Sequence, residues 1–269
     1  MRLLPLPAFL TLVVISAAAD PKLPAPELTE YYSPVPPVVS APTNGVPSDA
    51  IVLFNGTSLD GWEPSIADNL PWRLENGAMV VVSGKVSPEE AARVAATPGR
   101  HPDSKHAGFR TTREFGDVQL HLEFRTPAEV KGKGQGRGNS GVFFMGLYEL
   151  QVLDSYDNPT YVNGQAGSIY KQHPPLVNAS RPPGEWQTYD VVFIAPRFTP
   201  GGALATPARM TVFHNGVLVQ HDVTLSGPTE YQGQPKYVAH AAKLPLMLQD
   251  HGNPVAFRNI WIRELTSRN

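Results

Sequence analysis

The chain has 269 residues, of which 41% are hydrophobic, with a formal net charge of −2 and no cysteine. Balanced charge argues against a basic nucleic-acid-binding surface, and the missing cysteines exclude thiol catalysis, cysteine-ligated zinc and iron–sulfur clusters. The 23 Gly and 28 Pro residues favour many short strands joined by turns over long helices. We therefore expect an all-β domain of about 220 residues, which is large enough to fold by core packing alone.

Residues 1–19 have the pattern of a secretory signal peptide. Arg2 precedes an apolar run from Leu3 to Ile15, and small residues follow at 16–19. The run is shorter than the roughly 20 apolar residues that span a bilayer, and no later stretch is longer. We therefore expect a secreted or periplasmic protein whose mature form has no membrane span; the alternative is that the segment is retained as an anchor.

The next segment, residues 20–48, is rich in proline and shows little alternation of polar and apolar residues. This composition predicts an extended linker or arm. The folded domain is expected to cover residues 49–267.

Two β-hairpins are indicated by Asn76-Gly77 and Asn215-Gly216, because Asn-Gly favours the tight type I′ turn. The strand-like runs that flank these turns are 72–75 with 78–82 and 208–214 with 217–223. Further strands are expected at 51–54, 118–125, 142–145, 148–154, 188–194, 244–249 and 255–265.

One short helix is predicted at residues 88–95. Ser87 can cap its first turn, Pro88 suits the first helical position, and two glutamates follow near the positive end of the helix dipole.

Alternation along two of the strands predicts how their side chains are divided. In 118–125 the apolar residues share one face, and His121, Glu123 and Arg125 share the other. In 148–154, Leu150 and Val152 are expected to point inward and Glu149 and Gln151 outward. Together the strands predict an antiparallel sandwich of two sheets. If the polar faces of neighbouring strands meet on a curved sheet, they would line a groove.

Residues 136–141 fit the G-x-G-x-x-G pattern of dinucleotide-binding loops. That pattern needs a preceding strand and a following helix, whereas a Lys/Gly-rich stretch precedes it and a strand-like run follows it. We therefore interpret this segment as a loop that enters a strand.

Four polar clusters are candidates for a carbohydrate site, and each has a structural alternative. Glu123 with Arg125 could bind sugar hydroxyls or form a surface ion pair worth under about 1 kcal/mol. Glu149 and Gln151 share a face close to Asn139 in the chain order, and Asp154 lies at the strand end, but a lone carboxylate on a strand is more often structural. The remaining candidates are Gln249 with Asp250 and His251, and Lys171 with His173.

His251 is the best proton-transfer candidate of these, because imidazole titrates near neutral pH. The alternative is that Asp250 or Asn253 caps a tight turn. Lys171 and His173 lie on a loop stiffened by prolines, and Trp186, which begins a strand, is expected in the core rather than as a sugar-stacking surface. The sequence has no recognisable metal-binding pattern.

Several motifs in fixed order resemble the bacterial 3-keto-disaccharide hydrolase family over residues 50–265. They are FNGTSLDGW at 54–62, LEFR at 122–125, NSGV at 139–142, YELQVLD at 148–154, PGEW at 183–186, LQDHG at 248–252 and FRNI at 257–260. The resemblance implies a concanavalin-like jelly roll, export from a bacterial cell, and action on glycosides already oxidised at carbon 3.

That chemistry needs a base for the acidified C2 hydrogen, an acid for the leaving oxygen and donors for the enolate. Glu149 or His251 is the candidate base, and Asp154 or Glu123 the candidate acid or orienting group. The candidate substrate-binding residues are Arg125, Asn139, Gln151, Gln249, Lys171 and His173. A divalent cation that holds the enolate, and a non-catalytic carbohydrate-binding module, stay open as alternatives.

Overall fold

The computed structural model describes residues 23–43, 45–65, 72–81 and 108–265. The predicted signal peptide and the predicted helix at 88–95 lie outside these residues. The chain divides into two units, 1–38 and 39–269. In the first unit, the described residues are exposed and include one 3₁₀ turn, η1 (Pro26–Thr29). Across the described part of the chain, no helix has the length and apolarity needed to cross a membrane.

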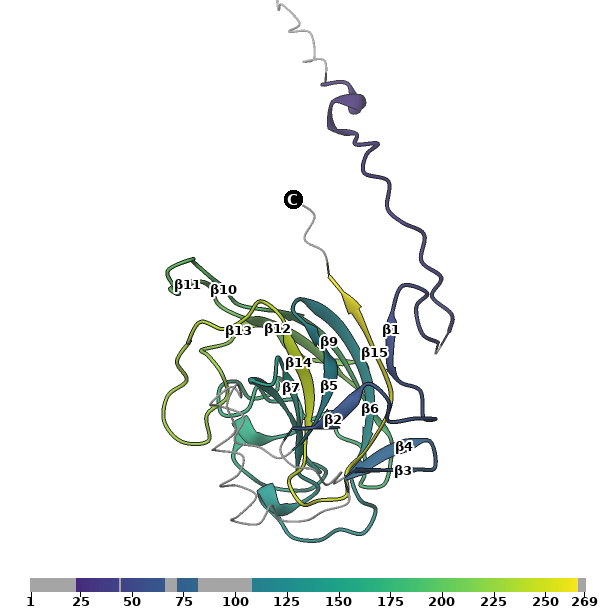
Figure 1. The fold of residues 1–269 in the computed structure, drawn as a ribbon, viewed down its shortest axis with the longest axis vertical. Helices are drawn as coiled ribbons and strands as arrows, with labels where there is room; N and C mark the ends of the chain where they lie inside the picture. Colours follow the sequence, from purple (N-terminus) through teal and green to yellow (C-terminus); the bar gives the residue numbers. More distant parts are fainter. Residues whose placement is uncertain (1–22, 44, 66–71, 82–107, 266–269) are drawn as a thin grey trace, which may run out of the picture. The chain divides into compact units, whose positions relative to one another are not determined.

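The second unit contains a larger sheet of eight antiparallel strands (Figure 1). Its order is β13 (Val217–Thr224), β12 (Arg209–His214), β9 (Gln187–Ile194), β6 (Val118–Arg125), β15 (Ala256–Glu264), β4 (Ala78–Val81) and β3 (Trp72–Glu75), with β1 (Ile51–Phe54) also paired to β15.

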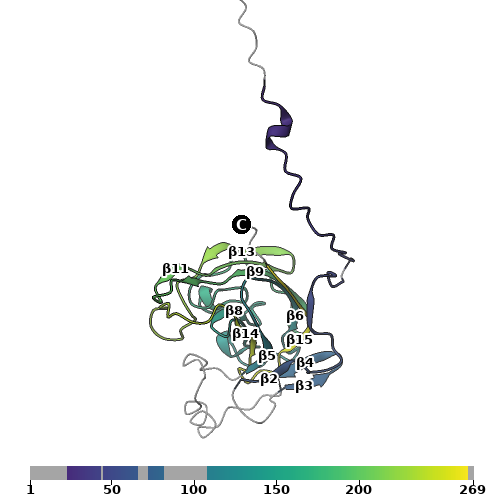
Figure 2. The ribbon, with the colours of Figure 1, turned by 45° about the horizontal axis from the view of Figure 1, so that its top comes forward.

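A sheet of five antiparallel strands faces it, and Figure 2 shows the larger sheet as a curved layer around β8, β14 and β5. The order of the smaller sheet is β2 (Trp62–Pro64), β5 (Gly108–Phe115), β14 (Leu244–Gln249), β7 (Ser140–Phe144) and β8 (Tyr148–Val152). A separate ribbon pairs β10 (Arg197–Phe198) with β11 (Leu204–Thr206), and two further 3₁₀ turns are η2 (Gly134–Gly136) and η3 (Val162–Gly164).

The sequence pattern explains most of this architecture, and the predicted jelly-roll sandwich is confirmed. Strand β6 has strictly alternating burial, and its apolar side chains belong to one core between the two sheets. Both Asn-Gly pairs have positive φ at each residue, as the type I′ turn requires. The run after the glycine-rich segment is strand β7, which agrees with the rejection of a dinucleotide-binding loop.

Strand β5 is absent from the predicted set for a physical reason. Its sequence, GFRTTREF, has apolar residues only near its ends, and three consecutive residues in its second half are exposed. The strand is held instead by pairing with β14 and β2 on its two sides. Local alternation therefore carries no signal for it.

Strand β8 has the predicted orientation but not the predicted exposure. Leu150 and Val152 join the core, and Glu149 and Gln151 point to the other side, yet every residue of β8 is buried. Residues 166–170 bond to its free edge: Ser168 O accepts from Gln151 N at 3.0 Å, and Tyr170 N donates to Glu149 O at 3.2 Å. The edge of the strand is therefore covered, and loop residues such as Gln135, Tyr161 and Tyr231 lie beside its outer face.

One sequence prediction about the site is wrong. The polar faces of β6 and β8 do not meet in a groove, because the two strands belong to opposite sheets. Their apolar faces pack into the same core, so Glu123 and Arg125 point away from Glu149 and Gln151.

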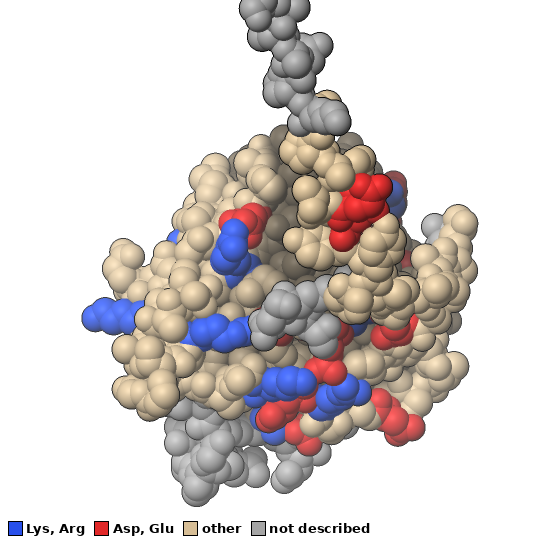
Figure 3. Space-filling model, turned by 90° about the horizontal axis from the view of Figure 1, so that it is seen from above, with Lys and Arg blue, Asp and Glu red and all other residues tan. Residues whose placement is uncertain are grey.

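On the face shown in Figure 3, acidic and basic side chains lie beside one another rather than in a field of one sign.

Candidate active site

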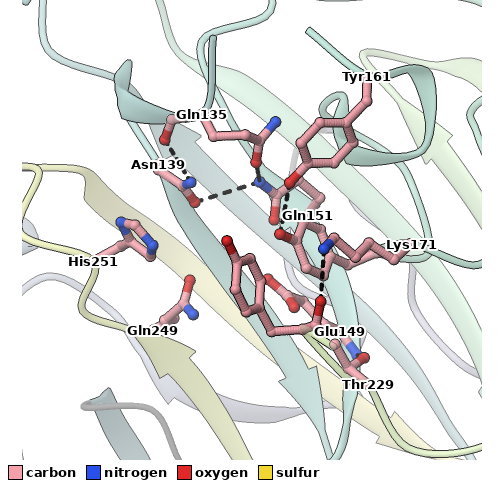
Figure 4. Close-up of a pocket in the computed structure, with 11 residues that line it drawn as sticks. Gln135, Asn139, Glu149, Gln151, Tyr161, Lys171, Thr229, Gln249 and His251 are labelled. Atoms are coloured by element: carbon pink, nitrogen blue, oxygen red, sulfur yellow. Dashed lines mark hydrogen bonds between the residues drawn. The ribbon is translucent and has the colours of Figure 1, made fainter. Parts of the chain in front are cut away.

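A cavity of about 400 Å³ lies on the outer side of β8, away from the core (Figure 4). It lies within the size range of small-molecule sites, about 300–1,000 Å³. Strands β8 and β14, the segment before β7, and the loops around η3 and residue 230 supply its walls. The lining residues are Gln135, Asn139, Glu149, Gln151, Tyr161, Tyr170, Lys171, Thr229, Tyr231, Gln249 and His251.

The floor of the cavity is polar and buried. Asn139, Glu149, Gln151 and Gln249 each expose at most 5% of their surface. Gln151 Nε2 donates to Asn139 Oδ1 at 3.3 Å and to Gln135 Oε1 at 3.2 Å. Asn139 Nδ2 in turn donates to Gln135 O at 2.7 Å (Figure 4). This network orients the amides before any ligand enters.

Two oxygens of the floor have no hydrogen-bond partner among the described residues, namely Gln151 Oε1 and Gln249 Oε1. Leaving a buried polar atom unpaired costs about 1–3 kcal/mol. Such atoms persist where a ligand can satisfy them. The floor therefore has hydrogen-bond acceptor capacity that the described part of the chain leaves unused.

Glu149 is the single acidic side chain among the described residues that line the cavity. Within the described part of the chain its carboxyl group has neither an ion-pair nor a hydrogen-bond partner, and it lies against the backbone of Gly141. Burial raises the pKa of Glu149 to about 8, because the charged form loses its hydration. The carboxyl group is therefore mostly protonated at neutral pH and can donate a proton.

The rim is aromatic and carries one cation. Lys171 Nζ donates to Tyr231 O at 2.6 Å and lies 4.1 Å from the centroid of the Tyr231 ring. The hydroxyl groups of Tyr161 and Tyr170 are 2.6 Å apart. Burial is the main cause that raises the pKa of each of these two tyrosines, so both stay neutral. Tyr161 and Tyr231 are 40% and 61% exposed, which leaves ring surface available for stacking.

His251 contributes from the loop that follows β14. The imidazole is exposed and lines the cavity, whereas its neighbour Asp250 is turned to the backbone and accepts a hydrogen bond from Gly252 N at 2.8 Å. Burial raises the pKa of Asp250. Asp250 therefore caps the turn, as the alternative interpretation expects, whereas the imidazole of His251 is accessible to a ligand in the cavity.

The structure brings together six of the ten residues proposed from the sequence, namely Asn139, Glu149, Gln151, Lys171, Gln249 and His251. The other four lie elsewhere. Asp154 is buried in an ion pair with Arg137, whose Nε is 2.6 Å from Asp154 Oδ2. His173 Nε2 lies 2.9 Å from Thr224 O and is not part of the cavity lining.

The other two displaced residues lie on the large sheet. Glu123 accepts from Arg258 Nε at 2.6 Å, and the Arg125 guanidinium lies 4.7 Å from the centroid of the Trp186 ring. Trp186 itself is half-buried rather than fully packed in the core. These placements correct the expectation that Glu123, Arg125, Asp154 and His173 belong to the same site.

Sequence reasoning missed five lining residues, Gln135, Tyr161, Tyr170, Thr229 and Tyr231. All lie in loops or 3₁₀ turns, where no periodicity marks a side chain as functional. The only indication of these residues in the sequence is that three of them are tyrosines in long loops, where an aromatic ring is available for stacking on a ligand. Within the described ranges, there is no group of three or more His, Cys, Asp and Glu side chains that could hold a metal ion.

A cavity with a buried amide floor, one protonatable carboxyl group and an exposed aromatic rim suits a sugar, which offers many hydroxyl groups and apolar ring faces. Fold and site together define a carbohydrate-active jelly-roll protein. Residues 49–263 match the model of the 3-keto-alpha-glucoside-1,2-lyase-like domain, so the chain belongs to that family.

Solved structures agree with this membership. The chain is 42% identical to a candidate glycosyl hydrolase from Parabacteroides distasonis, with a TM-score of 0.75, over 90% of this chain and 97% of the other. A second candidate glycosyl hydrolase from the same organism has 18% identity and a TM-score of 0.54, over 81% of this chain and 94% of the other, and supports the fold. No curated protein matches the chain.

Proposed function

We propose that this protein cleaves the glycosidic bond of 3-keto-disaccharides or related 3-keto-glycosides by elimination across C1 and C2, followed by addition of water. The observation that carries the proposal is that Glu149 alone, among the described acidic residues, lines the cavity. Ordinary glycosidases use two carboxyl groups across the scissile bond. A ketone at C3 removes that need, because it acidifies the C2 hydrogen.

His251 and Glu149 serve as the proton-transfer pair in this scheme. His251 takes the C2 proton, and the electron pair of that bond passes into the C3 carbonyl to give an enolate. Collapse of the enolate forms the C1–C2 double bond and breaks the bond from C1 to the leaving oxygen. Glu149, protonated because burial raises its pKa to about 8, donates its proton to that oxygen.

Hydration then restores both residues. Water adds its oxygen to C1 and gives one proton to the Glu149 carboxylate, and the protonated His251 returns a proton to C2. The net change is one glycoside and one water converted to a 3-keto sugar and an alcohol. No oxidant or reductant is consumed, because the C3 ketone is present in substrate and product alike.

The other lining residues bind and orient the sugar. Amide groups of Asn139 and Gln249 can hold the enolate oxygen or neighbouring hydroxyl groups, and preorganised donors of this kind stabilise developing charge. The exposed rings of Tyr161 and Tyr231 can stack on a second sugar unit at the rim.

The decisive experiment compares two glutamates on strands. Glu149→Gln is expected to lower kcat/KM on a 3-keto-disaccharide by about 100-fold or more, because it removes the acid. Glu123→Gln, on the opposite sheet, is the matched control and should keep the activity. His251→Gln should cause a loss similar to that of Glu149→Gln. Normal turnover in both cavity variants would reject the proposal.

The pH profile separates the two assignments of Glu149. If Glu149 is the acid, kcat/KM falls above about pH 8 as its carboxyl group ionises. If it were the base, the rate would rise towards that pH.

Binding of an unoxidised disaccharide, with no turnover of any 3-keto substrate, would instead favour the carbohydrate-binding module.

The proposal includes export to the periplasm or the medium, supported by the signal-peptide pattern of residues 1–19. N-terminal sequencing of protein expressed in a bacterial host tests it. A mature chain that begins near residue 20 is expected, and a cytoplasmic chain that keeps Met1 would contradict it.

A further inference from the structure

A second cavity, of about 300 Å³, opens at the end of the large sheet and shares no lining residue with the first. Strand β3, the end of β6 and the segment before β15 form its walls. Its polar lining includes Arg73, Glu75, Arg125 and Thr126. The volume lies at the lower end of the range for ligand sites, which is the size of one sugar ring rather than a chain.

Arg125 brings to this cavity a positive charge that has no ion-pair partner among the described residues. Its guanidinium group is held 4.7 Å from the Trp186 ring centroid, and it has no ion-pair or hydrogen-bond acceptor among the described residues. Glu123, two residues earlier on the same face of β6, is already paired with Arg258 at 2.6 Å. The five N–H donors of the Arg125 guanidinium are therefore not used by side chains or carbonyl groups of the described residues.

Two further features of the lining fit an acceptor-rich ligand. Thr126 is buried, and its Oγ1 has no hydrogen-bond partner within the described part of the chain. Arg73 and Glu75 form an ion pair at 2.5 Å, so they add polar groups without adding net charge. Among the described residues, the lining thus includes a guanidinium without an ion-pair partner, a buried hydroxyl without a hydrogen-bond partner and a neutral ion pair.

We propose that this cavity binds an oxyanion, specifically the carboxylate of an acidic sugar such as a uronic acid. A planar carboxylate matches the forked donors of arginine, which can grip both oxygens at once, and Thr126 can donate to one of them. The loop after β14 lines the first cavity at His251 and the second at Pro254, so both cavities lie beside one loop. The inference does not depend on the proposed catalytic function.

Calorimetric titration of the full chain with glucuronate, glucose and inorganic phosphate tests this site. Glucuronate is expected to bind, and glucose, which lacks the carboxylate, is expected to bind this cavity at least ten times more weakly. Arg125→Gln should weaken glucuronate binding at least tenfold, and Thr126→Val several-fold. Arg113→Gln is the matched control, because Arg113 also lies over an aromatic ring, that of Phe115, and is paired with Glu264.

The anions and variants distinguish the outcomes. Phosphate that binds as tightly as glucuronate, with both lost in Arg125→Gln, would support an oxyanion site whose source is free phosphate. Binding of glucuronate that survives both Arg125→Gln and Thr126→Val, or no binding at all, would overturn the proposal. Glu149→Gln should leave glucuronate binding intact while it lowers kcat/KM on a 3-keto-disaccharide about 100-fold or more. The oxyanion site and the proposed catalytic function can therefore fail independently of each other.

Discussion

Gly141 and Glu149 lie on neighbouring strands with no space between them for another atom: a Cβ on Gly141 would be 2.6 Å from Glu149 Oε1. The backbone of Gly141 does not have positive φ, so its glycine is explained by this close approach rather than by a turn. A side chain at residue 141 would therefore have to displace the carboxyl group of Glu149.

We expect Gly141→Ala to displace this carboxyl group and lower kcat/KM on a 3-keto-disaccharide about tenfold or more, because small misplacements of a reacting group are costly. Steady-state kinetics measures the loss, and thermal unfolding shows whether the fold survives. Gly201→Ala is the control, since its nearest foreign atom is 3.9 Å away and its φ is not positive. An unchanged rate in Gly141→Ala would mean that Glu149 needs no fixed position.

The stability of the protein should depend on pH through Glu149. Between about pH 4.5 and 8 the unfolded chain has lost this proton while the folded chain keeps it. The free energy of unfolding therefore falls as pH rises in this window, by at most about 1.4 kcal/mol per pH unit from this group. Above pH 8 both states are ionised, and the dependence ends.

Because glutamine does not titrate, Glu149→Gln should gain stability relative to the wild type as pH rises from 5 to 8. Urea unfolding of both proteins at pH 5, 6.5 and 8 measures the difference. A difference that stays constant over this range would show that the pKa of Glu149 is not raised.

Gln249→Met should separate binding from stability. Gln249 Oε1 is buried without a partner in the described structure, so its removal breaks no internal hydrogen bond. The free energy of unfolding should stay equal or rise by about 1 kcal/mol, and KM should rise about tenfold. Gln220→Met is the matched control, because Gln220 Nε2 donates to Gly167 O at 2.9 Å and to Pro174 O at 3.0 Å. That variant should lose about 2 kcal/mol. Equal loss in both would contradict a ligand-binding role.

Asp154→Ala should destabilise the fold rather than act on the chemistry. The Asp154 side chain is 3% exposed and Arg137 is 13% exposed, so removal of the carboxylate leaves a largely buried charge unpaired. We expect a loss of about 3–5 kcal/mol in the free energy of unfolding, partly recovered in Asp154→Ala/Arg137→Ala. Denaturant unfolding of both variants measures this. A stable Asp154→Ala protein without turnover would instead place Asp154 in the mechanism.

The sequence alone was sufficient for the fold class and for most strands. In 118–125 the alternation predicts which side chains face the core, and the observed burial follows it. The turns at Asn76-Gly77 and Asn215-Gly216 were equally predictable. These features are local, since the period of a strand and the φ of a turn depend on neighbouring residues.

The composition of the site needed the tertiary structure. Alternation shows that Glu123 shares a face with Arg125 and that Glu149 shares a face with Gln151, but it does not show which sheet each strand joins. Sheet membership depends on pairing between distant segments, such as β6 with β15 and β7 with β14. The outcome placed the two polar faces on opposite sides of the core.

Burial of the site was also decided by distant segments. Glu149 is an ordinary outward-facing residue by its sequence pattern, and it becomes a buried, protonated acid because loops cover the outer side of β8. The tyrosines at 161 and 231 reach the same cavity from two of these loops. Residue order thus determines which face of a strand is apolar, whereas desolvation, and with it the raised pKa, exists only after the chain has folded over that strand.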